Sequence, residues 1–319
     1  MLRPLRITGL VIALAASSAA AQDYPNRPVR LVVPFGTGGA TDSSARSLAD
    51  RLPRHLGQSV VIENRAGAGG NIGTQFVAQA PADGYTLLLA LDATMVVNPF
   101  THAKVPFDTL RDFAPVTKLG DVALMLAAHP SLPAKNLAEL LAYSKANPDK
   151  LSFSTGGTGS TTHVAGELLK QRTGLAMTHI PYKSGGLAVM DAVGGQVPLS
   201  YTAIAGASSQ VRAGKLIGIG VSSPKRVASL PDVPTFVEQG LAGFEATSWV
   251  GILAPAHTPQ PVIDRLHREI TKILGEIKDG LHEQGMEVWI SDPAALMQRV
   301  RDDRAKWAKV IKDYNVRAD

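Results

Sequence analysis

The sequence of 319 residues contains no cysteine. Disulfide bonds, thiol catalysis and thiolate metal sites are therefore excluded. Charged residues are also few, at 18%, whereas hydrophobic residues make up 45%. This composition is typical of a folded globular protein and not of a disordered chain. A chain of this length can form two domains, each with a core of its own.

Several sequence motifs of enzymes are absent as well. Gly67, Gly69 and Gly73 miss the G-x-G-x-x-G spacing of dinucleotide-binding proteins by one residue, and no lysine follows a glycine run as a phosphate-binding P-loop requires. The G-x-S-x-G turn of many serine hydrolases does not occur. The eight histidines are scattered and form no H-E-x-x-H motif. We therefore expect no metal, no cofactor and no enzyme activity.

Long apolar segments are missing after the N-terminus. There, Arg3 and Arg6 precede an apolar run at residues 7–16 that is too short to span a bilayer, and small residues follow at 19–21. This pattern is typical of a secretory signal peptide, residues 1–21, cleaved after Ala21. An uncleaved N-terminal anchor is the alternative. We expect an exported protein that is free in the periplasm.

The formal net charge is weakly positive, at +5. Removing Arg3 and Arg6 with the signal peptide leaves +5 − 2 = +3. Such a charge suits anionic solutes, although a slightly basic, solvated surface is the simpler explanation. Because no basic run is interleaved with aromatic residues, we expect no nucleic-acid partner.

A glycine-rich stretch at residues 34–42 is the feature around which the chain is organised. It follows a compact apolar run at residues 29–33, which predicts a buried strand. It precedes apolar residues with helical spacing, namely Ala45, Leu48, Ala49 and Leu52. The stretch is therefore a strand-to-helix turn. Its glycines allow close approach of a ligand, and the helix N-terminus favours an anion.

Two similar turns follow, at residues 64–71 after a strand at 59–63 and at residues 154–163 after a strand at 151–153. Repetition of strand, turn and helix indicates a parallel sheet. One glycine turn alone more often serves packing than binding. Three turns at the carboxyl ends of strands, where ligands bind in α/β sheets, favour a receptor for a small anion.

The rest of the chain continues the α/β pattern. Asn136 with Glu139, and Asp292 with Pro293, mark helix starts. Further strands are expected at residues 85–91, 122–128, 177–181, 199–203, 216–221, 249–253 and 287–290, and further helices at 72–80, 136–147, 164–172, 208–212, 261–274 and from 293. Residues 98–115, broken by three prolines, read as loops, and residues 222–234 as a connection. On the face of the last helix we expect Leu296, Val300, Trp307, Ile311 and Tyr314.

Two clusters of these units predict two domains. Domain 1 comprises residues 22–120 and 235–319, and domain 2 comprises residues 121–234. The chain then crosses between the domains near Gly120 and again within 222–234. Ligand sites favour such domain interfaces.

Some polar residues near the turns have two interpretations. Asp42 either caps its helix or contacts the ligand, and the two are equally favoured. For Lys183 an ordinary charge pair with an acid is favoured over a ligand contact. His163 is expected to orient its loop and not to bind a metal.

Several stretches together resemble one family over nearly the whole mature chain. In order they are Y-P-N-R-P, V-V-P-F-G-T-G-G-A-T-D, V-I-E-N-R-A-G-A-G-G-N-I-G-T, A-D-G-Y-T-L-L, G-T-G-S-T-T-H-V-A-G-E-L-L-K, I-P-Y-K, D-A-V-G-G-Q-V, L-P-D-V-P-T and W-V-G-I-L-A-P-A-H-T-P. The set resembles the substrate receptors of tripartite tricarboxylate transporters, also called the Bug family.

The resemblance implies an α/β, two-domain periplasmic binding protein of type II-like architecture, with a two-strand hinge and a ligand cleft between the domains. Such a receptor closes around a small carboxylate, which is a dicarboxylate, a tricarboxylate, an amino acid or an aromatic acid. The closed form then docks on the membrane subunits of the transporter. Backbone N–H and hydroxyl groups hold the carboxylate. We expect a monomer. A periplasmic sensor subunit is the alternative, and a periplasmic hydrolase or lyase is a weaker one.

The resemblance also implies which residues bind the ligand. One wall of the cleft would comprise Phe35, Gly38, Gly39, Thr41, Asp42, Gly69, Gly70 and Asn71. The other wall would comprise Thr155, Gly159, Ser160, Thr161, Tyr182, Ser184, Gly185 and Ala203. The chain departs from the family pattern at Gly36-Thr37, at Ser184 and at residues 197–199. Because these positions border the cleft, the ligand of a relative cannot be assumed for this chain.

Overall fold

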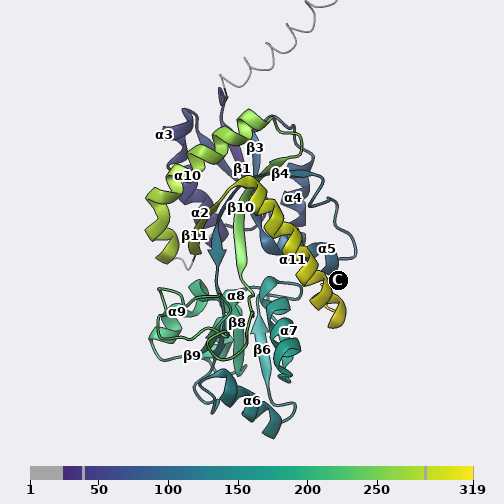
Figure 1. Ribbon diagram of the computed structural model, residues 1–319, viewed down its shortest axis with the longest axis vertical. Coiled ribbons are helices and arrows are strands. Elements are labelled where there is room, and N and C mark those ends of the chain that lie inside the picture. The colour runs from purple at the N-terminus through teal and green to yellow at the C-terminus, as the bar shows by residue number, and fades with distance from the viewer. Residues whose placement is uncertain (1–23, 38–39, 284–285, 319) are drawn as a thin grey trace, which may run out of the picture.

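The computed structural model describes residues 24–37, 40–283 and 286–318 (Figure 1). The predicted signal peptide and the predicted site residues Gly38 and Gly39 lie outside the described residues. Among the described residues, no helix combines the length and the apolar character that crossing a membrane requires.

The first sheet has six strands in the order β11-β4-β10-β3-β1-β2. Their bounds are β1 (Val29–Val33), β2 (Val60–Asn64), β3 (Thr86–Leu91), β4 (Phe113–Val122), β10 (Ser248–Pro255) and β11 (Met286–Ser291). β1 pairs in parallel with both β2 and β3, with Leu31 opposite Ile62 and Leu87. β10 runs antiparallel between β3 and β4. The parallel strands therefore end at one edge of the sheet, as the repeated units predict.

The second sheet has five strands in the order β7-β6-β8-β5-β9. Their bounds are β5 (Leu124–Ala128), β6 (Ser152–Thr155), β7 (Thr178–Pro181), β8 (Leu199–Ala203) and β9 (Ile217–Val221). β6 is parallel to β7 and β8, whereas β5 is antiparallel to β8 and β9. Two mixed sheets with helices confirm the predicted α/β class.

Each sheet with its helices forms one lobe, and the two lobes are stacked along the long axis of the molecule (Figure 1). The first lobe contains α2 (Ala40–Ala49), α3 (Leu52–Leu56), α4 (Asn71–Ala78), α5 (Asn98–Thr101), α10 (Gln260–Glu283) and α11 (Pro293–Asp313). The second lobe contains α6 (Leu137–Ala146), α7 (Thr161–Thr173), α8 (Gly185–Val193) and α9 (Ile204–Arg212). The 3-10 turn η1 (Ala68–Gly70) precedes α4, and the π-helical turn η2 (Ala93–Val97) precedes α5. The C-terminal end of α11 reaches α7, where Gln171 donates a hydrogen bond of 2.7 Å to Asp313.

Two adjacent strands connect the lobes. β4 of the first sheet continues into β5 of the second with only Ala123 between them. The returning strand β10 begins at Ser248, directly opposite Val122. These antiparallel strands are the two-strand connection that the resemblance implies, and the first crossing lies close to the expected Gly120.

Hydrogen bonds near the expected second crossing bear on where the chain returns to the first lobe. The Phe236 N–H donates to Val221 at 3.0 Å, Gln239 donates to Ile219 at 2.9 Å, and the Ala246 N–H donates to Ser222 at 3.0 Å. These bonds keep residues 235–246 on the second lobe. The domain boundaries remain a prediction, and the bonds favour placing the second boundary near residue 247.

Residues 98–115 were expected to be loops, and this expectation is wrong because the segment is not entirely loop. They contain α5 and the start of β4. Pro115 lies within β4 opposite Leu253, next to an irregularity in the register of β10. Such an irregularity accommodates a residue without an N–H, so the proline does not end the strand.

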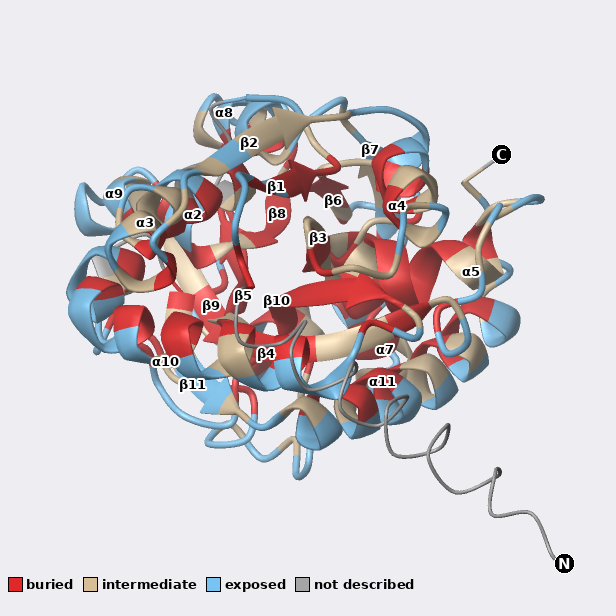
Figure 2. Ribbon diagram, turned by 90° about the horizontal axis from the view of Figure 1, so that it is seen from above, coloured by how far each residue is buried: buried red, intermediate tan, exposed pale blue. Residues whose placement is uncertain are grey.

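The apolar faces of the long helices build the core. α10 buries a helical stripe that includes Leu266, Ile270 and Ile273 and continues to Leu281, so the helix extends beyond the expected residue 274. On α11, Leu296, Val300, Trp307 and Ile311 are buried and Tyr314 is partly buried, as predicted. Seen from above, buried strands occupy the centre and the exposed helix surfaces lie outside (Figure 2).

Candidate functional site

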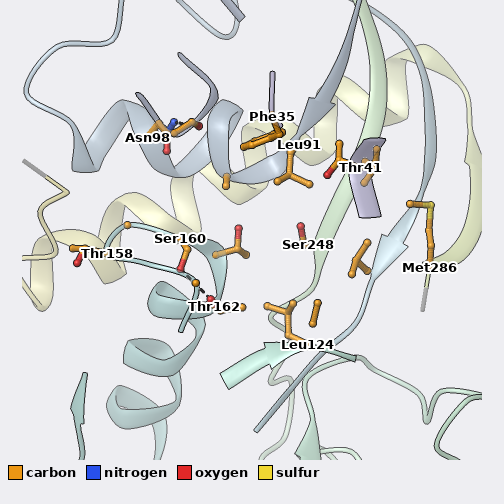
Figure 3. Close-up of a pocket in the computed structure, with 18 of the residues that line it drawn as sticks. Phe35, Thr41, Leu91, Asn98, Leu124, Thr158, Ser160, Thr162, Ser248 and Met286 are labelled. Atoms are coloured by element: carbon orange, nitrogen blue, oxygen red, sulfur yellow. Dashed lines mark hydrogen bonds between the residues drawn. The ribbon is translucent and has the colours of Figure 1, made fainter. Parts of the chain in front are cut away.

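A cavity of about 370 Å³ lies between the lobes (Figure 3). Both lobes line it, with Phe35, Thr41, Gly69, Leu91, Ala93, Asn98, His102, Val122, Leu124, Gly156, Thr158, Gly159, Ser160, Thr161, Thr162, Ala203, Ser248, Val250 and Met286. All three glycine turns contribute to this lining. The structure therefore brings together three separate turns, of which the first, at residues 34–42, and the third, at residues 154–163, lie more than a hundred residues apart.

The turn before α7 supplies much of the polar lining. Ser160 caps the helix, since its hydroxyl accepts the His163 N–H at 3.2 Å and donates to the Gly157 carbonyl at 2.7 Å. A helix leaves its first N–H groups without intrahelical acceptors. Thr161 and Thr162, the first helical residues, line the cavity. The N-terminal end of α7 therefore faces the space where a ligand would lie.

His163 holds this turn in place. The Gly159 N–H donates to Nδ1 of His163 at 3.1 Å, so Nδ1 carries no proton. Burial, with the neighbouring His179, lowers the pKa of His163 to about 3, and the two rings stack with centroids 3.6 Å apart. The expectation that His163 orients its loop is confirmed. Thr155 lies behind the turn, where its hydroxyl is 2.7 Å from Nε2 of His179, and does not line the cavity.

On the first lobe, Gly69 lines the cavity and its neighbours support it. Asn98 donates to the Gly69 carbonyl at 2.9 Å and to the Asn71 side chain at 2.8 Å. Gly70 has a φ of 93°, and a Cβ there would lie 2.6 Å from the hydroxyl of Thr94. Gly70 and Asn71 are thus buried behind Gly69 and shape the turn without lining the cavity.

Asp42 is buried beside the cavity and does not line it. Its carboxylate accepts hydrogen bonds from Arg46 at 2.9 and 3.2 Å and from Asn64 at 2.9 Å. Asn64 also donates to the Phe35 carbonyl at 3.1 Å. These bonds tie α2 to the end of β2 and favour the structural interpretation of Asp42. Its neighbour Thr41 does line the cavity.

Besides Thr155, three predicted residues of the second lobe lie outside the cavity lining, namely Tyr182, Ser184 and Gly185. Ser184 caps α8 by accepting the Leu187 N–H at 3.4 Å, and Gly185 begins that helix. The hydroxyl of Tyr182 donates to Asp191 at 2.7 Å. Lys183 is exposed and also does not line the cavity.

The predicted residues that the structure brings together around the cavity are Phe35, Thr41, Gly69, Gly159, Ser160, Thr161 and Ala203. The prediction omitted the residues after β3, those of the connecting strands, and Asn98 and His102. The lining residues at the end of β3 could have been predicted from the sequence. β3 itself was expected as a strand, and the carboxyl ends of parallel strands meet at one edge of a sheet, where ligands bind. Unlike β1, β2 and β6, β3 is followed by no glycine turn that would mark its end as part of a site.

Asp92 is the most unusual residue of this missed region. It directly follows β3 and is fully buried. Thr161 donates to its carboxylate at 3.1 Å, and Ser248 donates to it as well. Burial, together with the charge of Asp303, raises the pKa of Asp92 to about 7, although its hydrogen bonds partly oppose the increase. Because Thr161 belongs to α7, this carboxylate links the two lobes.

The cavity is otherwise almost uncharged. The residues described as lining it include no Lys, Arg, Asp or Glu, and His102 is the titratable side chain among them. In the described ranges, no three His, Asp or Glu side chains gather as a metal ion would require. The arrangement offers N–H and hydroxyl donors at one end and apolar side chains at the other, which suits binding.

Comparisons with known proteins point to one family. A sequence profile for the tripartite tricarboxylate transporter family receptor, TctC, matches residues 44–316. The chain is 38% identical to protein BugT of Bordetella pertussis, and the match covers 98% of each chain.

Solved structures agree with this finding. The periplasmic binding protein BugD is 38% identical with a TM-score of 0.78, over 92% of this chain and 99% of BugD. Rpa4515 of R. palustris, determined with adipate, is 35% identical with a TM-score of 0.83, over 92% of this chain and 99% of Rpa4515. These similarities confirm the predicted fold of a two-domain periplasmic binding protein.

Proposed function

Because the chain belongs to the tripartite tricarboxylate transporter receptor family, we propose that it captures a small carboxylate between its lobes and delivers it to the membrane subunits of such a transporter. Family membership also confirms the expectation of a receptor and not an enzyme. In this proposal, residues 1–21 direct export to the periplasm and are removed after Ala21.

The N-terminal end of α7 carries the proposal. Thr158, Ser160 and Thr162 line the cavity at this end, where α7 begins at Thr161. A helix N-terminus favours an anion through its dipole and its unpaired N–H groups. Since no acidic side chain is among the described lining residues, nothing on the described walls repels a carboxylate directly.

The opposite end of the cavity is mostly apolar. Leu91 and Met286 lie away from Thr158 and Ser160, together with the hydroxyl residue Thr41 (Figure 3). Burying a charged group among apolar side chains without a partner is costly. The geometry therefore supports a ligand with its carboxylate toward α7 and an apolar portion toward the connecting strands. Adipate, named with Rpa4515, has such an apolar chain but carries a second carboxylate at its far end, which needs a polar partner such as the hydroxyl of Thr41.

Thermal shift measurements on the mature protein test the proposed capture. The panel contains adipate, hexanoate, benzoate, malate, citrate and glutamate. We expect at least one acid to raise the melting temperature, since ligand at a hundredfold excess over its Kd stabilises by about 2.7 kcal/mol. A panel without any shift would contradict the proposal.

Delivery needs a separate experiment in cells. Uptake of the bound acid should require both this protein and the membrane subunits. If the acid binds but its uptake is unchanged when the protein is deleted, the sensor alternative replaces delivery.

A further inference from the structure

Asp92 is a buried carboxylate for which the proposed capture has no role. It lies between Leu91 and Ala93, both of which line the cavity, yet Asp92 itself is fully buried behind the lining. A buried carboxylate is usually paired with a cation, because removing the charge from water is costly. Its hydrogen bonds in the structure come instead from the hydroxyls of Thr161 and Ser248 and from the backbone N–H of Ala93.

Both of these hydroxyls also face the ligand space. Thr161 starts α7 in the second lobe, Ser248 starts β10, and both line the cavity. Figure 3 shows the Ser248 side chain among the lining residues, near the centre of the view. The group that fixes the direction of each O–H bond therefore determines whether that hydroxyl can donate a hydrogen bond to a ligand or only accept one.

The protonation state of Asp92 fixes those hydrogens. A hydroxyl has one hydrogen to donate and can accept two bonds. When Asp92 is ionised it can only accept, so both hydroxyls donate to it and present lone pairs to the cavity. When Asp92 is protonated, its own O–H donates to one hydroxyl, and that hydroxyl is free to donate toward a bound carboxylate.

The charge of Asp92 acts in the same direction. An ionised Asp92 directly behind the lining repels a ligand carboxylate, and burial strengthens that repulsion. Protonation removes the repulsion. Capture of an anion and protonation of Asp92 are therefore mutually favourable.

Among the described residues, the charged groups on the neighbouring elements do not supply a counter-ion. On α11, Asp303 raises the pKa of Asp92 further and is itself bound by Arg299 at 2.7 Å and by Lys306 at 3.0 Å. Arg304, also on α11, donates to Thr109 at 3.3 Å.

The other elements around Asp92 also hold their charges in local contacts. On α7, the first titratable groups are His163 and Glu167, which lie 3.7 Å apart, and Lys170 lies 2.8 Å from Glu167. On β4, Lys118 pairs with Asp121 at 2.7 Å. β10 carries no titratable side chain, and His102 lines the cavity beyond η2 and α5.

We propose that Asp92 is a positioning residue which sets the hydroxyls of Thr161 and Ser248 and couples carboxylate capture to the uptake of one proton. The proton comes from solvent and binds a carboxylate oxygen of Asp92. No covalent bond to the ligand forms or breaks. This inference rests on the proposed carboxylate capture.

Isothermal titration calorimetry with adipate tests the coupling. Titrations at pH 7.5 and 8.5, each in two buffers of different ionisation enthalpy, give the number of protons taken up. We expect uptake to approach one proton at pH 8.5, and affinity to fall roughly tenfold per pH unit there. Binding of adipate without proton uptake would overturn the proposal.

Asp92→Asn provides the matching variant. Its amide can donate to one hydroxyl as a protonated Asp92 does, so it should bind adipate with no proton uptake and more tightly than the wild type at pH 8.5. Asp83→Asn, at an exposed acid that pairs with Arg27, is the control and should keep the wild-type uptake. An Asp92→Asn variant that retains the wild-type pH profile would contradict the assignment.

A measurement without ligand separates this inference from the proposed function. The ¹³C carboxyl resonance missing from Asp92→Asn should titrate near neutral pH in the wild type. A resonance that titrates near the usual aspartate range overturns the proposal even if adipate binds. If the resonance titrates near neutral pH but adipate does not bind, the result supports the raised pKa of Asp92 and counts against the proposed capture of adipate.

Discussion

The start of α2 and the end of β3 each place a buried aspartate beside the cavity, and the two aspartates have different partners. Asp42 accepts from a guanidinium and an amide, Arg46 and Asn64. Asp92 accepts from two hydroxyls, those of Thr161 and Ser248, and these hydroxyls line the cavity. The first aspartate therefore joins elements of one lobe, whereas the second joins both lobes at the ligand space.

This difference shows that proximity to a glycine turn does not identify a ligand-binding acid. Arg46 compensates the charge of Asp42, so that carboxylate has a structural task without any ligand. Asp92 is bonded to hydroxyls and not to a cation, and burial raises its pKa at a place where an anion is proposed to bind. The side-chain partners, and not the position in the motif, distinguish the two roles.

The largest expected effect is on the pH dependence of stability. The pKa of Asp92 is raised from 3.8 to about 7, so the folded state holds a proton that the unfolded state has lost between pH 4 and 7. Stability from this group therefore falls as pH rises through that window, by about 4 kcal/mol at 1.36 kcal/mol per pKa unit. Urea unfolding of the wild type and Asp92→Asn should show this difference, with the variant gaining relative stability toward pH 8.

The buried histidines titrate in the opposite sense and must be separated from this effect. Burial lowers the pKa of His163 to about 3 and that of His179 to about 4, so their contribution is lost as pH falls below about 6.5. The contribution of the two histidines is the same in the wild type and in Asp92→Asn, so it cancels when the stabilities of these two proteins are compared. Parallel stability profiles for the two proteins would remove the distinction between Asp92 and Asp42.

A smaller effect is expected from Thr161→Val, which removes one donor to Asp92. At pH 8 the loss of a hydrogen bond to an ionised buried group should cost about 1.5–3 kcal/mol. Thr162→Val is the matched control, because Thr162 also lines the cavity but lies 2.9 Å from Ser160 and is not bonded to Asp92. Unfolding at pH 8 and pH 5 measures both variants. Equal losses at both pH values would show that Thr161 does not sense the charge of Asp92.

Asp42→Asn should have a lesser effect, of about 1–2 kcal/mol, because Arg46 is half-exposed and solvent screens its pair with Asp42. The loss should be the same with and without ligand, and the order of affinities among glutamate, malate and adipate should not change. Calorimetry with these acids checks this. A selective loss for glutamate would restore Asp42 as a ligand contact.

The smallest difference separates two helix caps that were both predicted to bind ligand. Ser160→Ala and Ser184→Ala each remove a cap and should each cost about 1 kcal/mol of stability. Only Ser160 lines the cavity, so only Ser160→Ala should also weaken ligand binding. Weaker binding in Ser184→Ala would extend the site toward α8.

Local patterns in the sequence predicted much of the fold. Asn136 caps α6, and its side chain bonds with Glu139 at 2.8 and 2.9 Å. Asp292 caps α11 ahead of Pro293. Both caps depend on residues that are close in the sequence, so the local sequence motif is enough to predict them. The β4 strand was missed, because Pro115 is accommodated only by the register of a partner strand that lies far along the chain.

The site was predictable in part for the same reason. Turns with glycine and hydroxyl residues are visible in the sequence, and the three turns do meet at the cavity. Asp92 gives no such signal, since its role depends on Thr161 and Ser248, which approach it from 69 and 156 residues away. Pairings of this kind exist only in the folded chain.

The most direct test of the central claim fills the cavity itself. Ala203 lines it as the last residue of β8, directly before α9, whereas Ala205 is exposed within α9. Calorimetry should compare Ala203→Leu, Ala205→Leu and the wild type with the acid that gives the largest thermal shift. Binding by the cavity predicts that Ala203→Leu loses affinity at least tenfold while Ala205→Leu matches the wild type. Unchanged affinity in a folded Ala203→Leu variant would place the ligand elsewhere and contradict the account.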